Sequence, residues 1–406
     1  MTDPTIATSS KQQGRPQARP QAKASLVNDP RVRGIVYQLL TLLVVVWIGV
    51  EFWTNAVSNL ERANIASGFG FLDTTAGFGI VQTLIEYTEE SSYGRAFFVG
   101  LFNTLIVAFF GIILATVIGF LVGIGSLSRN WLIRQICVAY VEVMRNIPLL
   151  LHLFFWYFGV LRAVPGPRES LNFLDSVFVN NRGIYFPRPE GGDGFGLVLI
   201  LVTIGIAASF FIARWARKRR EQTGQPFPVL YWSLGLIVGL PLAVFLLLGM
   251  PLTFDYPALK GFNFRGGIVM IPEFISLVLA LSIYTAGFIA ENVRSGIQSV
   301  NKGQTEAAYA LGIQPGPTMR LVIIPQAMRV IIPPLTSQYL NLTKNSSLAV
   351  AIAYPDLVSV FAGTVLNQTG QAVEILFLTM SVYLTLSIIT SILMNWYNSR
   401  IALVER

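Results

Sequence analysis

Long runs of apolar residues, separated by short polar segments, dominate this chain of 406 residues. Eight of the runs are close to the roughly 20 residues that an α-helix needs to cross a bilayer. The pattern predicts spans at 35–53, 97–127, 137–161, 197–213, 229–250, 271–290, 330–354 and 372–396. The fold class that follows is all-α, a polytopic transmembrane helical bundle of about eight spans. The first run lacks a small-residue cleavage site, so we expect an uncleaved span rather than a signal peptide.

Composition and charge agree with a membrane protein and assign a side to each loop. Hydrophobic residues make up 53% of the chain and charged residues only 12%, which is too apolar for a soluble protein of this size. The net charge of +8 comes from basic residues gathered at particular span ends, as the positive-inside rule requires of cytoplasmic loops. We therefore expect no nucleic-acid partner. Residues 54–95, 162–195 and 251–270 are predicted outside, and the Arg214 to Arg220 cluster and both termini inside.

The spans and loops divide the chain into three parts. Residues 1–33 are rich in Pro, Gln, Ala and Ser, with six basic residues, a composition typical of a disordered cytoplasmic tail. Residues 34–96 hold the first span and an outside loop. Residues 97–400 form the main transmembrane domain, with an outside insertion at about 162–195 and an inside loop at about 291–327.

The sequence lacks the residue patterns typical of ATP hydrolysis, disulfide bonding and metal binding. No Gly-Lys dipeptide occurs, so the phosphate-binding loop of an ATPase is absent. The single cysteine, Cys137, and the single histidine, His152, are too few for an internal disulfide or a histidine metal site. We expect a chain that is not an enzyme, with no catalytic residue, no metal site and no bound cofactor. Any ATP and Mg would be held by a separate ATPase.

The inside loop contains one short predicted helix, from Gln304 to Leu311. Alanines are strong helix formers with almost no side chain, and Gly312 can end the helix in the left-handed conformation. Pro315-Gly316-Pro317 is predicted to force a turn. A helix of alanines buries little surface, and Glu306 offers a charge to a basic group. These features indicate a docking element.

The spacing of this loop resembles the cytoplasmic motif of ABC importer permeases. The matching residues are Glu306-Ala307-Ala308, then Gly312, then Val322-Ile323-Ile324-Pro325, with Val322 and Ile324 as conservative departures. In that family the loop forms a coupling helix that docks on the ATP-hydrolysing subunit. The resemblance implies the type I ABC importer permease fold. It also implies that six residues contact an ATPase dimer: Gln304, Glu306, Ala307, Ala308, Gly312 and Pro325.

Two further segments resemble the polar amino-acid, histidine/glutamine-type branch of that family. Asn146-Ile147-Pro148-Leu149-Leu150 is similar to Arg-Gly-Thr-Pro-Leu-Leu, and the segment from Phe288 to Ser299 is similar to Tyr-x-Ala-Glu-x-x-Arg-Gly-Gly-Ile-x-Ser. The length of the chain resembles the larger permease of general L-amino-acid transport systems. The resemblance implies import of polar amino acids with broad specificity across a bacterial inner membrane. The implied partners are a periplasmic binding protein, an ATPase dimer and a second permease in a heterodimer.

The seventh span carries a polar stripe. Its members are Gln338, Asn341, Lys344, Asn345 and Ser346, and three of them recur at helical spacing. Polar groups in hydrocarbon are costly and usually face a cavity or another helix. In relatives the Lys-x-Ser-Ser-Leu segment lines the translocation pathway, and Lys344 to Leu348 matches it. The alternative is hydrogen bonding between helices that holds the bundle together.

Other interpretations remain open at this point. Glu142 and Arg145, three residues apart near an inner span end, are either a structural pair or part of transport. An ion-coupled secondary transporter would require ionisable residues at mid-membrane and two similar halves, and neither is evident. A membrane enzyme or channel is a third class, without a supporting constellation of residues.

Overall fold

The computed structural model describes residues 30–62 and 68–401, and the chain divides into two units, Met1–Ser67 and Gly68–Arg406. In the first unit the described residues form α1 (Pro30–Arg62). Its stretch Val32–Asn59 is long and apolar enough to span a membrane. A helix of that kind suits a lipid environment. The predicted tail lies outside the described residues up to position 29, so it stays a prediction.

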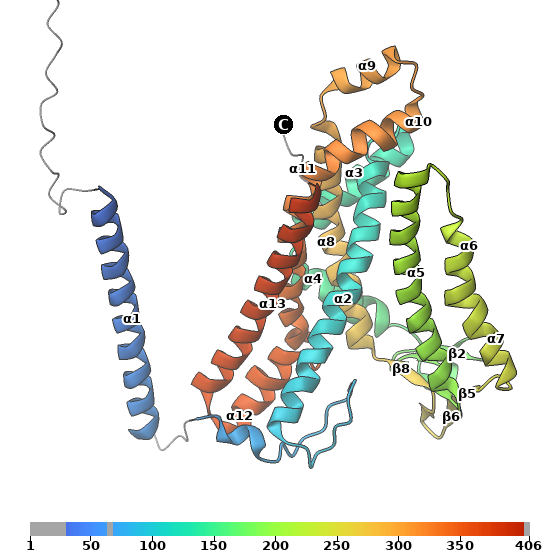
Figure 1. The fold of residues 1–406 in the computed structure, drawn as a ribbon. Coiled ribbons are helices and arrows are strands. Elements are labelled where there is room, and N and C mark those ends of the chain that lie inside the picture. Colours follow the sequence, from blue (N-terminus) through green and yellow to red (C-terminus); the bar gives the residue numbers. More distant parts are fainter. Residues whose placement is uncertain (1–29, 63–67, 402–406) are drawn as a thin grey trace, which may run out of the picture. The chain divides into compact units, whose positions relative to one another are not determined.

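The second unit is a bundle of helices with a group of short strands (Figure 1). Seven described helices, α1 included, are long and apolar enough to cross a membrane, and one bent pair brings the number to as many as eight. The predicted all-α bundle of about eight spans is therefore confirmed. The helices of the second unit are α2 (Tyr93–Gly125), α3 (Trp131–Asn146), α4 (Leu149–Phe154), α5 (Phe195–Thr223), α6 (Val229–Leu234), α7 (Leu240–Leu247), α8 (Pro272–Gln298), α9 (Lys302–Ala310), α10 (Pro315–Thr318), α11 (Ile324–Asn345), α12 (Leu366–Thr369) and α13 (Ala372–Ile401).

The core of the bundle is the contact between α2 and α8. Small residues recur every fourth position on the buried face of α2: Gly111, Ala115, Gly119 and Gly123. A methyl group added at Gly119 would lie 2.6 Å from Cβ of Ile289, and one added at Gly123 would lie 2.8 Å from the carbonyl oxygen of Ala290. Small residues at this spacing let two helix backbones approach closely, which drives helix association in membranes.

The third predicted span, residues 137–161, is bent and is not one continuous helix. The α-helix starts at Trp131 and ends at Asn146, and the chain then bends by 107° before the helical stretch Leu149–Leu161. The bend lies at Ile147 and Pro148. Ile147 is extended, with φ −101° and ψ 131°, because the ring of a following proline disfavours the helical conformation. Pro148 also lacks the N–H that would continue the helical ladder.

The outside insertion and the second outside loop fold together into β-structure, although they lie far apart in the sequence. Four strands form one sheet in the order β1 (Leu171–Phe173), β2 (Val177–Asn180), β3 (Gly183–Phe186) and β8 (Ile268–Met270). Two antiparallel pairs accompany it, namely β4 (Arg188–Gly191) with β5 (Leu252–Asp255), and β6 (Ala258–Lys260) with β7 (Asn263–Arg265). The rings of Phe178, Tyr185 and Phe264 pack together, with centroids 4.6 and 5.0 Å apart. Sequence reasoning left this region without a fold.

Two further differences from the predictions concern the chain around the seventh span. Helical structure begins at Pro315, in α10, and continues through a π-helical turn, Met319–Ile323, into α11. The predicted turn at Pro315-Gly316-Pro317 was wrong because proline is tolerated in the first turn of a helix, where its missing N–H has no partner to lose. The α-helix then ends at Asn345, earlier than predicted, and a 3₁₀ stretch continues to Ile352.

The second unit has two distinct ends. Figure 1 shows α9 at one end of the bundle and the strands at the other. Following the chain from the strands, α5 carries its basic cluster, Arg214 to Arg220, toward the end that bears α9. The last helix, α13, also runs toward that end. The loops predicted inside therefore share one end, and the insertion and the 251–270 loop share the other.

Candidate functional site

The predicted docking helix is present as α9, and both of its ends are capped. The side chain of Asn301 accepts a hydrogen bond from the N–H of Gly303 at 2.8 Å, which is a standard N-cap. At the other end Gly312 has φ +74°, so its predicted left-handed conformation is confirmed. The N–H of Gly312 donates to the carbonyl of Tyr309 at 2.9 Å, and the N–H of Ile313 donates to that of Ala308 at 3.0 Å. This pair of bonds is the Schellman motif, which fixes how the chain leaves the helix.

The residues of α9 divide between holding the helix and presenting a surface. Ala308 is buried, whereas Glu306 and Ala307 are exposed. Tyr309 and Leu311 add exposed apolar area on the same short segment, and Leu311 is 79% exposed. A charged group beside exposed apolar side chains at the tip of a loop is suited to contact with another protein.

Gln304 and Pro325, two residues predicted to contact a partner, are exposed and lie where the loop meets α11. The side-chain amide of Gln326 donates to Oε1 of Gln304 at 3.3 Å and to the carbonyl of Val322 at 3.0 Å. Pro325 lies in the first turn of α11 and is exposed. The bond between Gln326 and Gln304 thus links the start of α9 to α11, the helix that carries the polar stripe.

The polar stripe of α11 lies along the border between the buried and the exposed side of this helix. Asn341 and Lys344 are exposed, and Gln338 and Asn345 are half-buried. Apolar residues such as Ile331 and Leu342 are buried on the adjoining face of the helix, close in helical angle to Gln338 and Asn345. Within residues 30–62 and 68–401, the four stripe side chains donate and accept no hydrogen bond and form no ion pair. In the described part of the chain, these four side chains therefore form no hydrogen bonds to neighbouring helices, which was the alternative interpretation.

The fifth stripe residue, Ser346, has a different place from the others. It is fully buried, and its hydroxyl donates to the carbonyl of Thr343 at 2.7 Å. Next to it, Lys344 lines a pocket of about 480 Å³ between the end of α11 and α13. Three hydroxyl side chains of α13 share this pocket: Thr379, Tyr383 and Ser387. Val358, Met380 and Leu384 also line it, and the hydroxyls of Thr379 and Tyr383 already donate to the carbonyl of Ile375 and to Asp356, so Lys344 brings the one charge to a largely apolar surface.

Sequence reasoning missed a buried polar group close to that pocket. Asp356 is fully buried, and its carboxylate accepts from the N–H of Ser359 at 2.8 Å and from the hydroxyl of Tyr383 at 3.3 Å. The side chain of Asn103 donates to the carbonyl of Pro355 at 2.9 Å. These bonds fix the start of the helical stretch Val358–Val365 against α2 and α13. The available signal was an aspartate directly before a helix, a position that aspartate favours because it accepts from the free N–H groups there.

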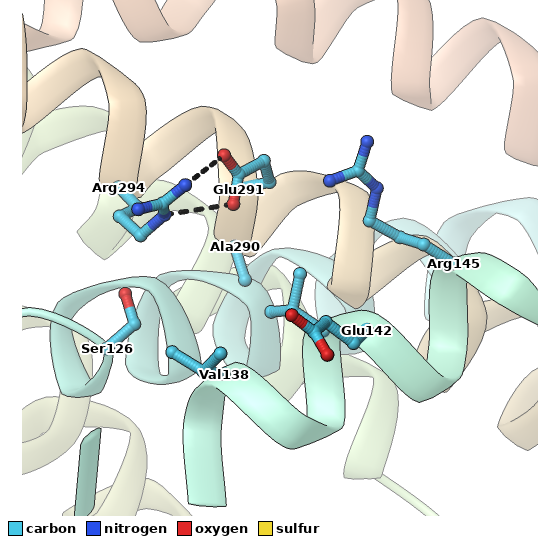
Figure 2. Close-up of a pocket in the computed structure, with 8 residues that line it drawn as sticks. Ser126, Val138, Glu142, Arg145, Ala290, Glu291 and Arg294 are labelled. Carbon is cyan, nitrogen blue, oxygen red and sulfur yellow. Dashed lines mark hydrogen bonds and ion pairs between the residues drawn. The ribbon is translucent and has the colours of Figure 1, made fainter. Parts of the chain in front are cut away.

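Four charged side chains line a second pocket, of about 270 Å³, at the end of the bundle that bears α9 (Figure 2). They are Glu142 and Arg145 on α3, and Glu291 and Arg294 on α8. Arg294 and Glu291 form a two-pronged ion pair, with N–O distances of 2.6 and 3.0 Å. The predicted structural pair between Glu142 and Arg145 is wrong, because the ion pair found among the described residues is that of α8.

No group of three or more His, Cys, Asp or Glu residues that could hold a metal occurs in the described part of the chain. The candidate site in the described residues consists of the short exposed helix α9, the polar stripe of α11 and two pockets.

Comparison of the sequence with known proteins gives the family. The family described as "Binding-protein-dependent transport system inner membrane component" matches residues 205–403. The chain is 58% identical over 384 residues to the general L-amino acid transport system permease protein AapQ of Rhizobium johnstonii, a match that covers 94% of this chain and 95% of that protein. It is 54% identical over 378 residues to the putative amino-acid ABC transporter permease protein YhdX of Escherichia coli, covering 93% and 96% of the two chains.

A solved structure described as an amino acid ABC transporter with histidines matches at 21% identity, with a TM-score of 0.45, over 76% of this chain and 95% of that one. The family assignment depends on the sequence relatives, which this chain matches almost from end to end. The chain belongs to the family of binding-protein-dependent transport system inner membrane components, and it is a multi-pass inner-membrane permease subunit of an ABC transporter, not an enzyme.

Proposed function

We propose that this permease subunit imports L-amino acids, with broad specificity for polar ones, using ATP hydrolysed by a separate ATPase. The observation that carries the proposal is the near full-length match, at 58% and 54% identity, to two permeases named for amino-acid transport. ATP and Mg would be bound by the ATPase, because this sequence contains no phosphate-binding loop of its own.

The docking surface for the ATPase is α9 with the residues that follow it. Glu306, Ala307 and Gly312 are exposed and free to contact a partner. Ala308 is buried and Gln304 is bonded to Gln326, so these two hold the helix in place. Pro325 acts in the same supporting way, because its fixed φ suits the first turn of α11.

The substrate pathway runs along the polar stripe of α11. Gln338, Asn341 and Asn345 present neutral amides that both donate and accept hydrogen bonds, so they can satisfy the α-amino and α-carboxyl groups of many amino acids. Lys344 adds one positive charge beside the pocket between α11 and α13. Ser346 is buried and supports the backbone at the end of α11. Polar residues left uncovered at membrane depth need a cavity or a partner helix, and a second permease subunit would supply the other wall.

The remaining partners follow from the two ends of the bundle. The end with α9 and the basic cluster would lie in the cytoplasm with both termini, because basic loops stay inside. The end with the strands would lie in the periplasm and receive substrate from a binding protein. The β-structure formed by the insertion and the 251–270 loop, which joins β3 to β8 and β4 to β5, offers a folded platform there.

The test is uptake by the reconstituted transporter. The two permeases and the ATPase are placed in proteoliposomes with ATP inside, and the binding protein loaded with labelled L-glutamine or L-glutamate is added outside. We expect uptake that requires ATP and survives proton and sodium ionophores. Uptake that persists without ATP and collapses with an ionophore would instead indicate an ion-coupled secondary transporter.

A further inference from the structure

The charged pocket between α3 and α8 has the size of a small-metabolite site. Its volume is about 270 Å³, just below the range of about 300 to 1,000 Å³ typical of pockets for drug-sized ligands. Val138 and Ala290 form part of its apolar lining, and the buried Ser126 at the end of α2 closes one side (Figure 2). An amino acid is smaller than a drug and fits this volume.

Two of the four charged side chains in the pocket form an ion pair with each other, and the other two, which are exposed, form none among the described residues. Glu291 and Arg294 neutralise each other through their two-pronged pair. Among the described residues, the carboxylate of Glu142 and the guanidinium of Arg145 have no hydrogen-bond or ion-pair partner. Arg145 lies over the ring of Phe288, 5.6 Å from its centroid. Stacking on a ring positions a guanidinium and leaves the N–H groups in its plane available.

One free guanidinium and one free carboxylate on the same helix match the two ends of a zwitterion. Arg145 offers a planar fork that binds a carboxylate through two parallel hydrogen bonds. Glu142 offers a carboxylate that accepts from an ammonium group. The four charged residues sum to zero, so a ligand without net charge leaves the pocket neutral.

We propose that this pocket binds the zwitterionic backbone of a free α-amino acid from the cytoplasm, with Arg145 on its carboxylate and Glu142 on its ammonium. The proposal rests on the proposed function, which places the end with α9 in the cytoplasm and supplies amino acid there. The ligand is thus the transported product, bound at a place separate from the polar face of α11.

The position of the pocket indicates how a bound amino acid would affect transport. Arg145 is one residue before the end of α3, and the chain bends by 107° immediately afterwards. The other wall of the pocket belongs to α8, which leads within a few residues to α9. A ligand that fills the space between α3 and α8 resists movement of one helix along the other. Accumulated amino acid therefore slows its own import.

The experiment uses the complete transporter in proteoliposomes that contain ATP and increasing L-glutamine, with initial uptake compared with that of glutamine-free vesicles of the same variant. Wild type is expected to lose uptake as internal L-glutamine rises. N-acetyl-L-glutamine, which lacks the ammonium, and L-glutaminamide, which lacks the carboxylate, are expected not to inhibit. In Arg145→Gln the concentration for half-inhibition should rise at least about tenfold, because a charge-assisted hydrogen bond is lost. Arg134→Gln, at an exposed position of α3 outside the pocket, should behave as wild type.

Three results would overturn the proposal. The first is wild-type uptake that internal glutamine leaves unchanged, and the second is equal inhibition by the two blocked analogues. The third is inhibition that is unchanged in both Arg145→Gln and Glu142→Gln. If one of these variants fails to assemble, unchanged inhibition in the other has the same meaning. If Arg145→Gln instead releases the ATPase during purification, the pocket is a subunit contact and the proposal is wrong. Failure of the proposed function is a separate result, namely no ATP-driven uptake into empty vesicles.

Discussion

Replacement of Gly312 tests whether transport depends on the backbone conformation of the docking loop or on the close approach of a partner. At φ +74° an ordinary L-residue costs roughly 1 to 2 kcal/mol relative to glycine. A β-branched residue costs more, whereas asparagine tolerates this conformation. No atom beyond the adjoining residues lies within 4 Å of the place where a Cβ would be, so the chain itself adds no steric penalty. The local cost is therefore backbone strain alone.

Strain of 1 to 2 kcal/mol changes a conformational equilibrium by a factor of roughly 5 to 30, and an intact bundle is not expected to unfold from it. We predict that Gly312→Val inserts and assembles in the membrane but transports at less than about one tenth of the wild-type rate. Gly312→Asn should also be impaired, because its side chain occupies the space that a close partner backbone needs.

The measurements are ATP-driven uptake, normalised to assembled complex, and the thermal stability of the purified permease. Gly316→Val is the matched control, because Gly316 is exposed nearby in α10, has no positive φ and also has nothing within 4 Å of its Cβ position. Wild-type uptake by Gly312→Val at normal expression would refute the docking role. Recovery of full uptake by Gly312→Asn would mean that the loop's shape matters and a close approach does not.

Three further predictions concern sidedness, specificity and packing. In a cysteine-free background, an impermeant thiol reagent on intact cells should label Leu171→Cys and spare Lys218→Cys, and labelling of position 218 would reverse the topology. Asn345→Asp should shift competition for uptake toward arginine and away from glutamate, since a carboxylate in a low-dielectric cavity favours a cation; an unchanged ratio would remove Asn345 from the pathway. Gly123→Leu should destabilise the bundle by about 1 to 3 kcal/mol or more, because even its Cβ would lie 2.8 Å from a backbone oxygen. Gly235→Leu, where nothing lies within 4 Å, should melt as wild type, and equal melting of the two variants would contradict the α2–α8 packing.

The parts of the fold that the sequence could predict are those in which local residues decide the structure. Apolar runs located the spans, and the alanines before Gly312 located α9 and its left-handed end. The polar spacing on α11 predicts a face that differs from a lipid-facing one, and in the structure Asn341 and Lys344 are exposed while Gln338 and Asn345 are half-buried. Which partner covers that face remains a proposal.

The wrong predictions of helix ends come from proline, which can either end a helix or begin one. Pro148 breaks a helix, whereas Pro315 and Pro317 begin one, and the difference depends on whether the preceding turn is already helical. The sheet was beyond reach for another reason: β3 pairs with β8 across a sequence distance that includes α5, α6 and α7. Three- and four-residue strands give too little periodicity to be found alone. The buried Asp356 was missed because an isolated aspartate beside a span reads as a loop residue.

The most direct test of the central claim, that α9 docks on an ATPase, is site-specific cross-linking in the assembled transporter. A single cysteine replaces Glu306 in an otherwise cysteine-free permease, and a short cross-linker that reacts with cysteine at one end and lysine at the other is applied. The control is a separate cysteine-free variant of the same permease in which a single cysteine replaces Leu171, on the strands at the opposite end of the bundle. The account predicts a covalent product with the ATPase subunit from position 306 and none from position 171. Absence of that product from a complex that still imports amino acids, or its appearance from position 171, would contradict the account.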